Sequence, residues 1–226
     1  MALLFRIKIC GVTNESDARL AAASGADAVG LNFFPPSPRY LSLPAAQEIA
    51  RALPAAICKV GVFVNADPDQ MLRLADQVGL DLLQLHGDEP AETLRQLSGR
   101  RLLRAFRLGP AGTLPVLRYL RRCRDLGCLP EAILVDAFQP GAYGGTGRTA
   151  DWNAVRELAA EVPELPLILA GGLTPDNVAA AIAAVRPTAV DTSSGVEASP
   201  GRKAPELVRE FVRRAHAALA RIADGS

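Results

Sequence analysis

The chain has 226 residues, of which 49% are hydrophobic, and its 25 basic and 24 acidic residues leave a net charge of +1. A chain of this length can bury a large core, whereas so small a charge offers no general attraction for nucleic acid or an anionic membrane. No segment approaches the roughly 18 consecutive apolar residues of a membrane helix. The opening MALLFR is too short for a signal peptide, so we expect a cytoplasmic protein.

Eight short apolar runs alternate with longer stretches rich in Ala, Leu and Arg. This alternation is typical of βα units stacked on a parallel sheet. The predicted strands are 5–10, 27–33, 57–64, 81–85, 102–106, 132–135, 166–170 and 188–191.

Capping residues mark the helices between these strands. Asn or Asp before a helix, Pro in its first turn and Gly after it are the usual signals. They predict helix starts at Asn14, at Asp67 before Pro68 and at Thr174 before Pro175, and helix ends at Gly25 and Gly79. Apolar residues at three- and four-residue spacing predict a final helix over about 205–222.

Eight such units over 226 residues fit a single (β/α)₈ barrel, a TIM barrel, formed by residues 1–226. The alternative is an open doubly wound sheet, which usually has fewer strands and often a Gly-rich turn after the first. Here the first turn is CGVTN, and no linker divides the chain. We therefore predict one closed barrel.

In a barrel, chemistry is expected where strands end and the following loops begin. Two such loops, in LILAGGLTPDNV and VDTSSGVE, follow the seventh and eighth predicted strands. Glycine and serine there offer N–H and hydroxyl donors in the place where barrels often bind phosphate. Either loop alone can be an ordinary turn, but together they predict a phosphate-ester site formed by Gly171, Gly172, Ser193, Ser194 and Gly195.

Other polar residues fall at the same predicted rim. Asp136 follows the sixth predicted strand and precedes a long, glycine-rich loop, so it is a candidate proton donor beneath a closing loop, the alternative being a simple capping residue. Arg39, in SPRY, is a candidate carboxylate clamp, although a surface ion pair is an equal alternative. His86, in LQLHGDE, is more typical of a structural or substrate-contact residue than of a base.

Cys10 closes the first predicted strand, in KICGVT. Taken alone, an unpaired Cys there is more often buried and inert. To act as a base it needs a nearby positive charge or a helix N-terminus that lowers its pKa. Lys8 is the candidate, because residues two apart on a strand share a face. The remaining cysteines, Cys58, Cys123 and Cys128, are expected to be reduced, and the last two lack the partners of a zinc site.

Seven motifs in order resemble the phosphoribosylanthranilate isomerase family: KICGVT, SPRY, LQLHGDE, LVDAF, GGTGRTADW, LAGGLTPDNV and VDTSSGVEASPG. The resemblance covers about residues 7–203. It implies a TIM barrel that catalyses the Amadori rearrangement of N-(5-phosphoribosyl)anthranilate to 1-(2-carboxyphenylamino)-1-deoxyribulose 5-phosphate in tryptophan biosynthesis, without cofactor or metal, as a monomer or homodimer.

The resemblance also implies residue roles. Cys10 matches the general base, Asp136 the general acid and Arg39 the residue that holds the anthranilate carboxylate. Gly171, Gly172, Ser193, Ser194 and Gly195 match the phosphate site, and Gln84, His86 and Asp191 are expected substrate neighbours.

The chain departs from the family after SPG, where it reads RKAPELVRE. We expect this to alter the start of the last helix and to touch no catalytic group. Three related barrel activities fit less well: a metal-dependent pentulose-phosphate epimerase, an imidazole-carboxamide isomerase with two Asp residues, and an indole-glycerol-phosphate synthase with Lys and Glu. A catalytically silent phosphosugar-binding barrel is the alternative from a different class, and turnover distinguishes it.

Overall fold

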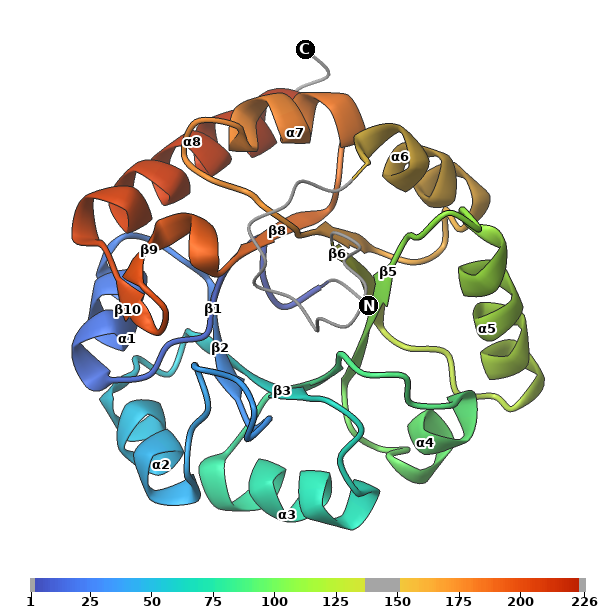
Figure 1. Cartoon of the computed structure of the whole chain (residues 1–226), viewed down its shortest axis with the longest axis horizontal. Coiled ribbons are helices and arrows are strands. Elements are labelled where there is room, and N and C mark those ends of the chain that lie inside the picture. Colours follow the sequence, from blue (N-terminus) through green and yellow to red (C-terminus); the bar gives the residue numbers. More distant parts are fainter. Residues whose placement is uncertain (1–2, 137–150, 224–226) are drawn as a thin grey trace.

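A computed structural model describes residues 3–136 and 151–223, and it contains a closed barrel of parallel strands with helices packed around the outside (Figure 1). Each strand pairs with the next one in sequence, and β8 pairs with β1 to close the barrel. The strands are β1 (Ile7–Cys10), β2 (Ala28–Asn32), β3 (Cys58–Phe63), β4 (Leu82–Leu85), β5 (Leu102–Arg107), β6 (Ala132–Asp136), β7 (Leu167–Leu169) and β8 (Ala189–Thr192).

The helices are α1 (Glu15–Ala23), α2 (Leu43–Ala52), α3 (Pro68–Val78), α4 (Ala91–Gln96), α5 (Leu114–Asp125), α6 (Trp152–Glu161), α7 (Val178–Val185) and α8 (Pro205–Ala223). All eight predicted strands are confirmed, each within two residues at either end, and the final helix is confirmed within one. The pairing of β1 with both β2 and β8 excludes the open sheet. No helix in the described part of the chain is long and apolar enough to cross a membrane.

Two of the predicted helix starts are confirmed by their capping bonds. The Asn14 side chain accepts a hydrogen bond from the backbone N–H of Asp17 at 2.8 Å, and Asp67 accepts one from Gln70 at 3.1 Å. Gly79 ends α3 in the left-handed conformation, with φ of 73°. These short polar side chains satisfy N–H groups that have no partner inside the helix.

The predicted helix start at Thr174 is wrong. α7 begins at Val178, with Asn177 as its N-cap residue. The Asn177 side chain accepts a hydrogen bond from the Thr174 N–H and donates one to the carbonyl oxygen of Gly172, both at 2.8 Å. These bonds close a separate turn after β7, which keeps the glycine loop against the following helix.

Strand alternation divides the buried side chains into two layers. One layer packs between strands and helices, and the other fills the barrel interior. The interior layer includes Ala28, Val60, Leu82, Leu103, Leu134, Ile168 and Ala189. Toward the C-terminal rim, the inward-facing positions of these strands are occupied by polar residues. They are Lys8, Cys10, Gln84, Asp136 and Asp191.

A small antiparallel hairpin after β8 was not among the predicted elements. A 3₁₀ helix, η1 (Ser194–Val196), leads into β9 (Glu197–Ser199) and β10 (Arg202–Lys203). The hairpin lies beside α1 and leads into α8 (Figure 1). Strands this short are below the length at which apolar alternation is readable. The glycine-rich loop predicted to close over the site, residues 137–150, lies outside the described residues.

Cys123 and Cys128 are free thiols at the end of α5, as expected. The backbone N–H of Cys128 donates to the Cys123 carbonyl oxygen at 2.9 Å, so the pair spans the turn that ends the helix. Within the described segments, no group of three or more His, Cys, Asp or Glu side chains is placed to hold a metal ion.

Candidate active site

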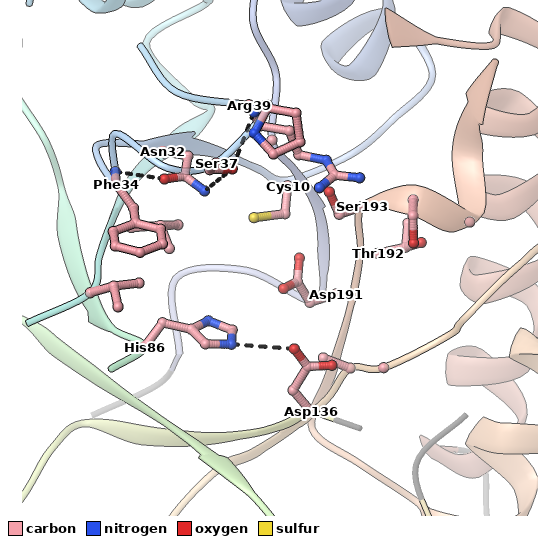
Figure 2. Close-up of a pocket in the computed structure, with 18 of the residues that line it drawn as sticks. Cys10, Asn32, Phe34, Ser37, Arg39, His86, Asp136, Asp191, Thr192 and Ser193 are labelled. Carbon is pink, nitrogen blue, oxygen red and sulfur yellow. Dashed lines mark hydrogen bonds and ion pairs between the residues drawn. The ribbon is translucent and has the colours of Figure 1, made fainter. Parts of the chain in front are cut away.

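The loops at the C-terminal end of the barrel enclose a pocket of about 210 Å³ (Figure 2). Most of the residues predicted from the sequence line it: Cys10, Arg39, His86, Asp136, Gly171, Gly172, Asp191, Ser193, Ser194 and Gly195. Gln84 is fully buried behind His86 and is not part of the wall. Its position therefore fits support of His86 better than the direct substrate contact expected above.

Cys10 and Asp136 face each other across this pocket (Figure 2). Cys10 is the last residue of β1 and Asp136 the last of β6, so the barrel holds them on opposite walls. His86 Nε2 lies 3.2 Å from Asp136 Oδ2, and the Gln84 amide nitrogen lies 2.7 Å from His86 Nδ1. Because an amide nitrogen only donates, Nδ1 accepts, and the ring proton on Nε2 donates to Asp136.

Lys8 lies inside the barrel, fully buried, with its Nζ 2.8 Å from Asp191 Oδ2. Burial raises the pKa of the Cys10 thiol, the charge of Lys8 opposes that rise, Asp191 adds to it and Lys203 opposes it. The net direction is upward because burial is the largest of these effects, and Asp191 moreover pairs with the lysine expected to activate Cys10. The surroundings of Cys10 thus favour its thiol form.

The loops after β7 and β8 pack directly on each other. Gly171 and Gly172 have φ of 86° and 62°, which side chains disfavour. A Cβ on Gly195 would lie 1.9 Å from the Leu173 carbonyl oxygen, so only glycine allows this approach. The Thr192 hydroxyl donates to the same oxygen at 2.7 Å. The glycines therefore form one continuous wall of the pocket.

Arg39 reaches the pocket from the loop after β2. Asn32 holds this loop, because its side chain accepts from the Phe34 N–H at 2.8 Å and donates to Ser37 Oγ at 3.2 Å. The Arg39 Nε and Nη2 atoms donate to the two carboxylate oxygens of Glu197, at 2.8 and 2.6 Å. The surface ion pair that was the alternative for Arg39 is wrong, because both side chains are buried.

Two buried charges behind the pocket wall, which contact its residues Arg39 and Cys10, were not predicted. Glu197 and Lys203 come from the hairpin after β8, and their side chains pair at 2.8 Å. Lys203 Nζ also donates to the Cys10 carbonyl oxygen at 2.6 Å, so the departing segment RKAPELVRE contacts the main chain of Cys10. Glu197 lies in the motif VDTSSGVEASPG, and an acid so close to a phosphate loop was the available signal.

Comparisons with known proteins agree with this geometry. The family model for N-(5'phosphoribosyl)anthranilate (PRA) isomerase matches residues 7–214. The N-(5'-phosphoribosyl)anthranilate isomerase of Rubrobacter xylanophilus is 45% identical over 215 residues, covering 93% of this chain and 98% of the relative. That of Geobacter sulfurreducens is 46% identical over 212 residues, covering 94% and 98%.

Solved structures agree as well. The phosphoribosyl anthranilate isomerase of Thermotoga maritima superposes with a TM-score of 0.81 at 39% identity, covering 94% of this chain and 99% of that one. A phosphoribosyl anthranilate isomerase in complex with reduced 1-(o-carboxyphenylamino)-1-deoxyribulose 5-phosphate has a TM-score of 0.79 at 38% identity, with the same coverage. The chain belongs to the phosphoribosylanthranilate isomerase family and is an isomerase of tryptophan biosynthesis.

Proposed function

We propose that Cys10 and Asp136 are the general base and general acid of the isomerisation. Asp136 protonates the ribose ring oxygen, which opens the ring to an iminium ion. The Cys10 thiolate then removes the proton from C2′, and the electron pair of that bond moves toward the iminium carbon to give an enolamine. Tautomerisation of the enolamine gives the ketone. The iminium accepts the electrons, so these steps need no cofactor.

The observation that carries this proposal is the placement of the two groups on opposite walls of one pocket. A base and an acid on different sides of a bound sugar can each come within reach of a different atom of it. His86 supports the assignment by holding the Asp136 carboxylate from one side. The raised pKa of the Cys10 thiol means that substrate binding has to favour the thiolate, and the charges of Lys8 and Lys203 are the nearby groups that oppose the rise.

The binding roles follow from the same wall. We propose that the loops containing Gly171, Gly172 and 193–195 hold the phosphate, since they form adjoining turns of the kind that binds anions. The Ser193 hydroxyl and the Asp191 Oδ1 atom are buried without a hydrogen-bond partner among the described residues, and both belong to pocket residues. Such atoms are costly unless a ligand pairs with them. The Ser193 hydroxyl can donate to a phosphate oxygen, whereas the Asp191 oxygen only accepts and therefore fits a hydroxyl of the ligand. Arg39 is proposed to bind the anthranilate carboxylate.

Replacement of the two proton-transfer groups tests the proposal. Cys10→Ala and Asp136→Asn are each expected to lower kcat by at least about 10², with little loss of affinity for the reduced product analogue. Turnover of freshly generated phosphoribosylanthranilate is followed by the fluorescence of its anthranilate group. Near-normal turnover in either variant contradicts the role of that residue, and binding without any turnover by the unmodified chain would favour the silent barrel.

The remaining proposals concern the whole chain. The eight units extend through the described residues from 7 to 223, which supports a single barrel domain over 1–226. Four free cysteines are usual in a reducing compartment, which supports the cytoplasm. The Thermotoga maritima relative is described as dimeric. For this chain we propose a monomer or a homodimer, which sedimentation velocity distinguishes.

A further inference from the structure

One edge of the Arg39 guanidinium, the pair of donors on Nε and Nη2, already binds a carboxylate of the protein itself. Its Nε and Nη2 atoms bind the two oxygens of Glu197, and both side chains are at most 10% exposed. A guanidinium offers a second, end-on fork through Nη1 and the other N–H of Nη2. A substrate carboxylate can therefore be bound in parallel bonds only at this second edge.

Arg39 is fixed along its length as well as at its head. A Cβ placed on Gly11 would lie 2.3 Å from Arg39 Cδ, so the side chain passes directly over the backbone that follows Cys10. Glycine at this position, with φ of 69°, leaves the room that the arginine needs. The loop after β2, the end of β1 and Glu197 thus all limit where the guanidinium points.

Glu197 is itself held by Lys203. The Lys203 Nζ atom donates to Glu197 Oε1 at 2.8 Å, to the Cys10 carbonyl oxygen at 2.6 Å and to the Ser193 carbonyl oxygen at 3.1 Å. These bonds use all the donors of an ammonium group. One buried side chain therefore connects the proposed base, the proposed phosphate loop and the partner of Arg39.

The charges of these three residues do not cancel. Arg39 and Lys203 are cations and Glu197 is the one carboxylate paired with both, so the group carries one excess positive charge. A buried charge without a counter-charge is unfavourable, and an anionic ligand in the adjoining pocket supplies the missing partner. Glu197 lowers that excess from two charges to one while it orients the arginine.

We propose that Glu197 is a positioning residue that, braced by Lys203, turns the end-on edge of Arg39 toward the carboxylate of the substrate. Glu197 acts through Arg39 and contacts neither the sugar nor the reacting atoms. This inference rests on the proposed function, in which Arg39 binds that carboxylate. It predicts that Glu197 determines discrimination in favour of carboxylated ligands.

The test compares two ligands: the reduced product analogue and the same molecule with a phenyl ring that lacks the carboxylate. Calorimetry gives the ratio of their dissociation constants for each variant. We expect Glu197→Gln, which keeps size and removes charge, to reduce this ratio at least about tenfold, while affinity for the phenyl ligand stays within about threefold. Glu206→Gln, at an exposed ion pair on α8, is the matched control and keeps the ratio.

Two further variants make the outcome decisive. Arg39→Ala is expected to abolish the discrimination between the two ligands. The double variant Arg39→Ala, Glu197→Gln is expected to show the same ratio of dissociation constants as Arg39→Ala alone. Arg39→Lys retains charge and the Glu197 partner but lacks the fork, and it too is expected to lose most of the discrimination. Where Glu197→Gln folds poorly, Glu197→Asp serves, because it keeps the charge but is too short to bind both Arg39 nitrogens as Glu197 does, and it is expected to lower the ratio as well.

These outcomes distinguish the carboxylate-binding role of Arg39 from the positioning role of Glu197. If Arg39→Ala keeps the discrimination, the proposed role of Arg39 is wrong, and so is the role of Glu197 that depends on it. If Arg39→Ala loses it but Glu197→Gln keeps or increases it, Arg39 binds the carboxylate and only the positioning role is overturned. An increase would mean that Glu197 competes with the ligand for the arginine.

Discussion

Besides the Lys8–Asp191 pair, two groups of buried charge lie near the same end of the barrel, and they differ in net charge. The outer cluster, Glu89 with Arg104, lies on the outward side of β5, beneath α5. The pocket cluster, Arg39, Glu197 and Lys203, lies beside Cys10. Both are held by the loops that follow the strands, so position in the fold alone does not distinguish them.

The outer cluster is balanced within the protein. Arg104 binds Glu89 at 2.8 Å and the Leu85 and Gly87 carbonyl oxygens at 2.9 and 3.1 Å, and it stacks near Tyr119. Glu89 also accepts the N–H of Asn65 at 2.8 Å. The pocket cluster instead has an excess positive charge and borders a cavity. Of these two clusters, the one beside the cavity is thus the one whose charges do not cancel.

The largest effect expected from this comparison is on stability. Glu89→Gln leaves the buried Arg104 guanidinium without its anionic partner, and we expect the free energy of unfolding in urea to fall by about 3 kcal/mol. The residue is not part of the pocket wall, so kcat at a temperature where the variant is folded should change little.

Glu92→Gln is the control for this variant, since Glu92 forms an exposed ion pair with Arg122. Exposed pairs contribute little to stability, so its unfolding midpoint should match that of the parent. Equal stability of Glu89→Gln and the parent would show that the outer cluster is not structural, and the distinction between the two clusters would then be lost.

The sequence predicted the barrel because its strand signals are local. Apolar runs such as 57–64 and 132–135 are typical of strands that are buried on both faces. Asp67 and Gly79 mark the two ends of α3 through their capping hydrogen bond and left-handed backbone. Thr174 was misread because its turn is closed by Asn177, whose side chain bonds backward. Capping signals name candidate residues, but a competing local bond decides which one is used.

Site residues at strand ends were predictable for the same reason, since topology brings strand ends together. The partners of those residues were not. Arg39 and Glu197 are 158 residues apart, and Lys203 and Cys10 are 193 apart. Nothing in a local pattern indicates such pairs, and the sequence accordingly suggested Lys8 as the only cation near Cys10. Lys8 is there, but it is paired with Asp191.

A smaller effect is expected at His86, which lines the pocket. His86→Ala removes the hydrogen bond to Asp136, and one such bond is worth about 0.5–1.5 kcal/mol. We expect kcat to fall by roughly tenfold at most, with the dissociation constant of the reduced product analogue nearly unchanged. A loss as large as that of Asp136→Asn would instead assign His86 a direct part in proton transfer.

The smallest expected effect is a difference in rate between two thiols inside the barrel. Burial is the largest cause that raises the pKa of both thiols, to about 12 for Cys58, and nearby cations oppose the rise at each of them. The difference lies in access, because Cys10 lines the pocket and Cys58 is buried at the start of β3, toward the other end of the barrel. A reagent has to reach the sulfur, and the thiolate is the species that reacts, so iodoacetamide at pH 8 should alkylate Cys10 before Cys58 in the folded protein. Mass spectrometry of the peptides measures both rates, and the reduced product analogue should slow only the reaction at Cys10. Equal rates, or no protection by the analogue, would mean that the pocket leaves Cys10 no more accessible than a thiol of the core.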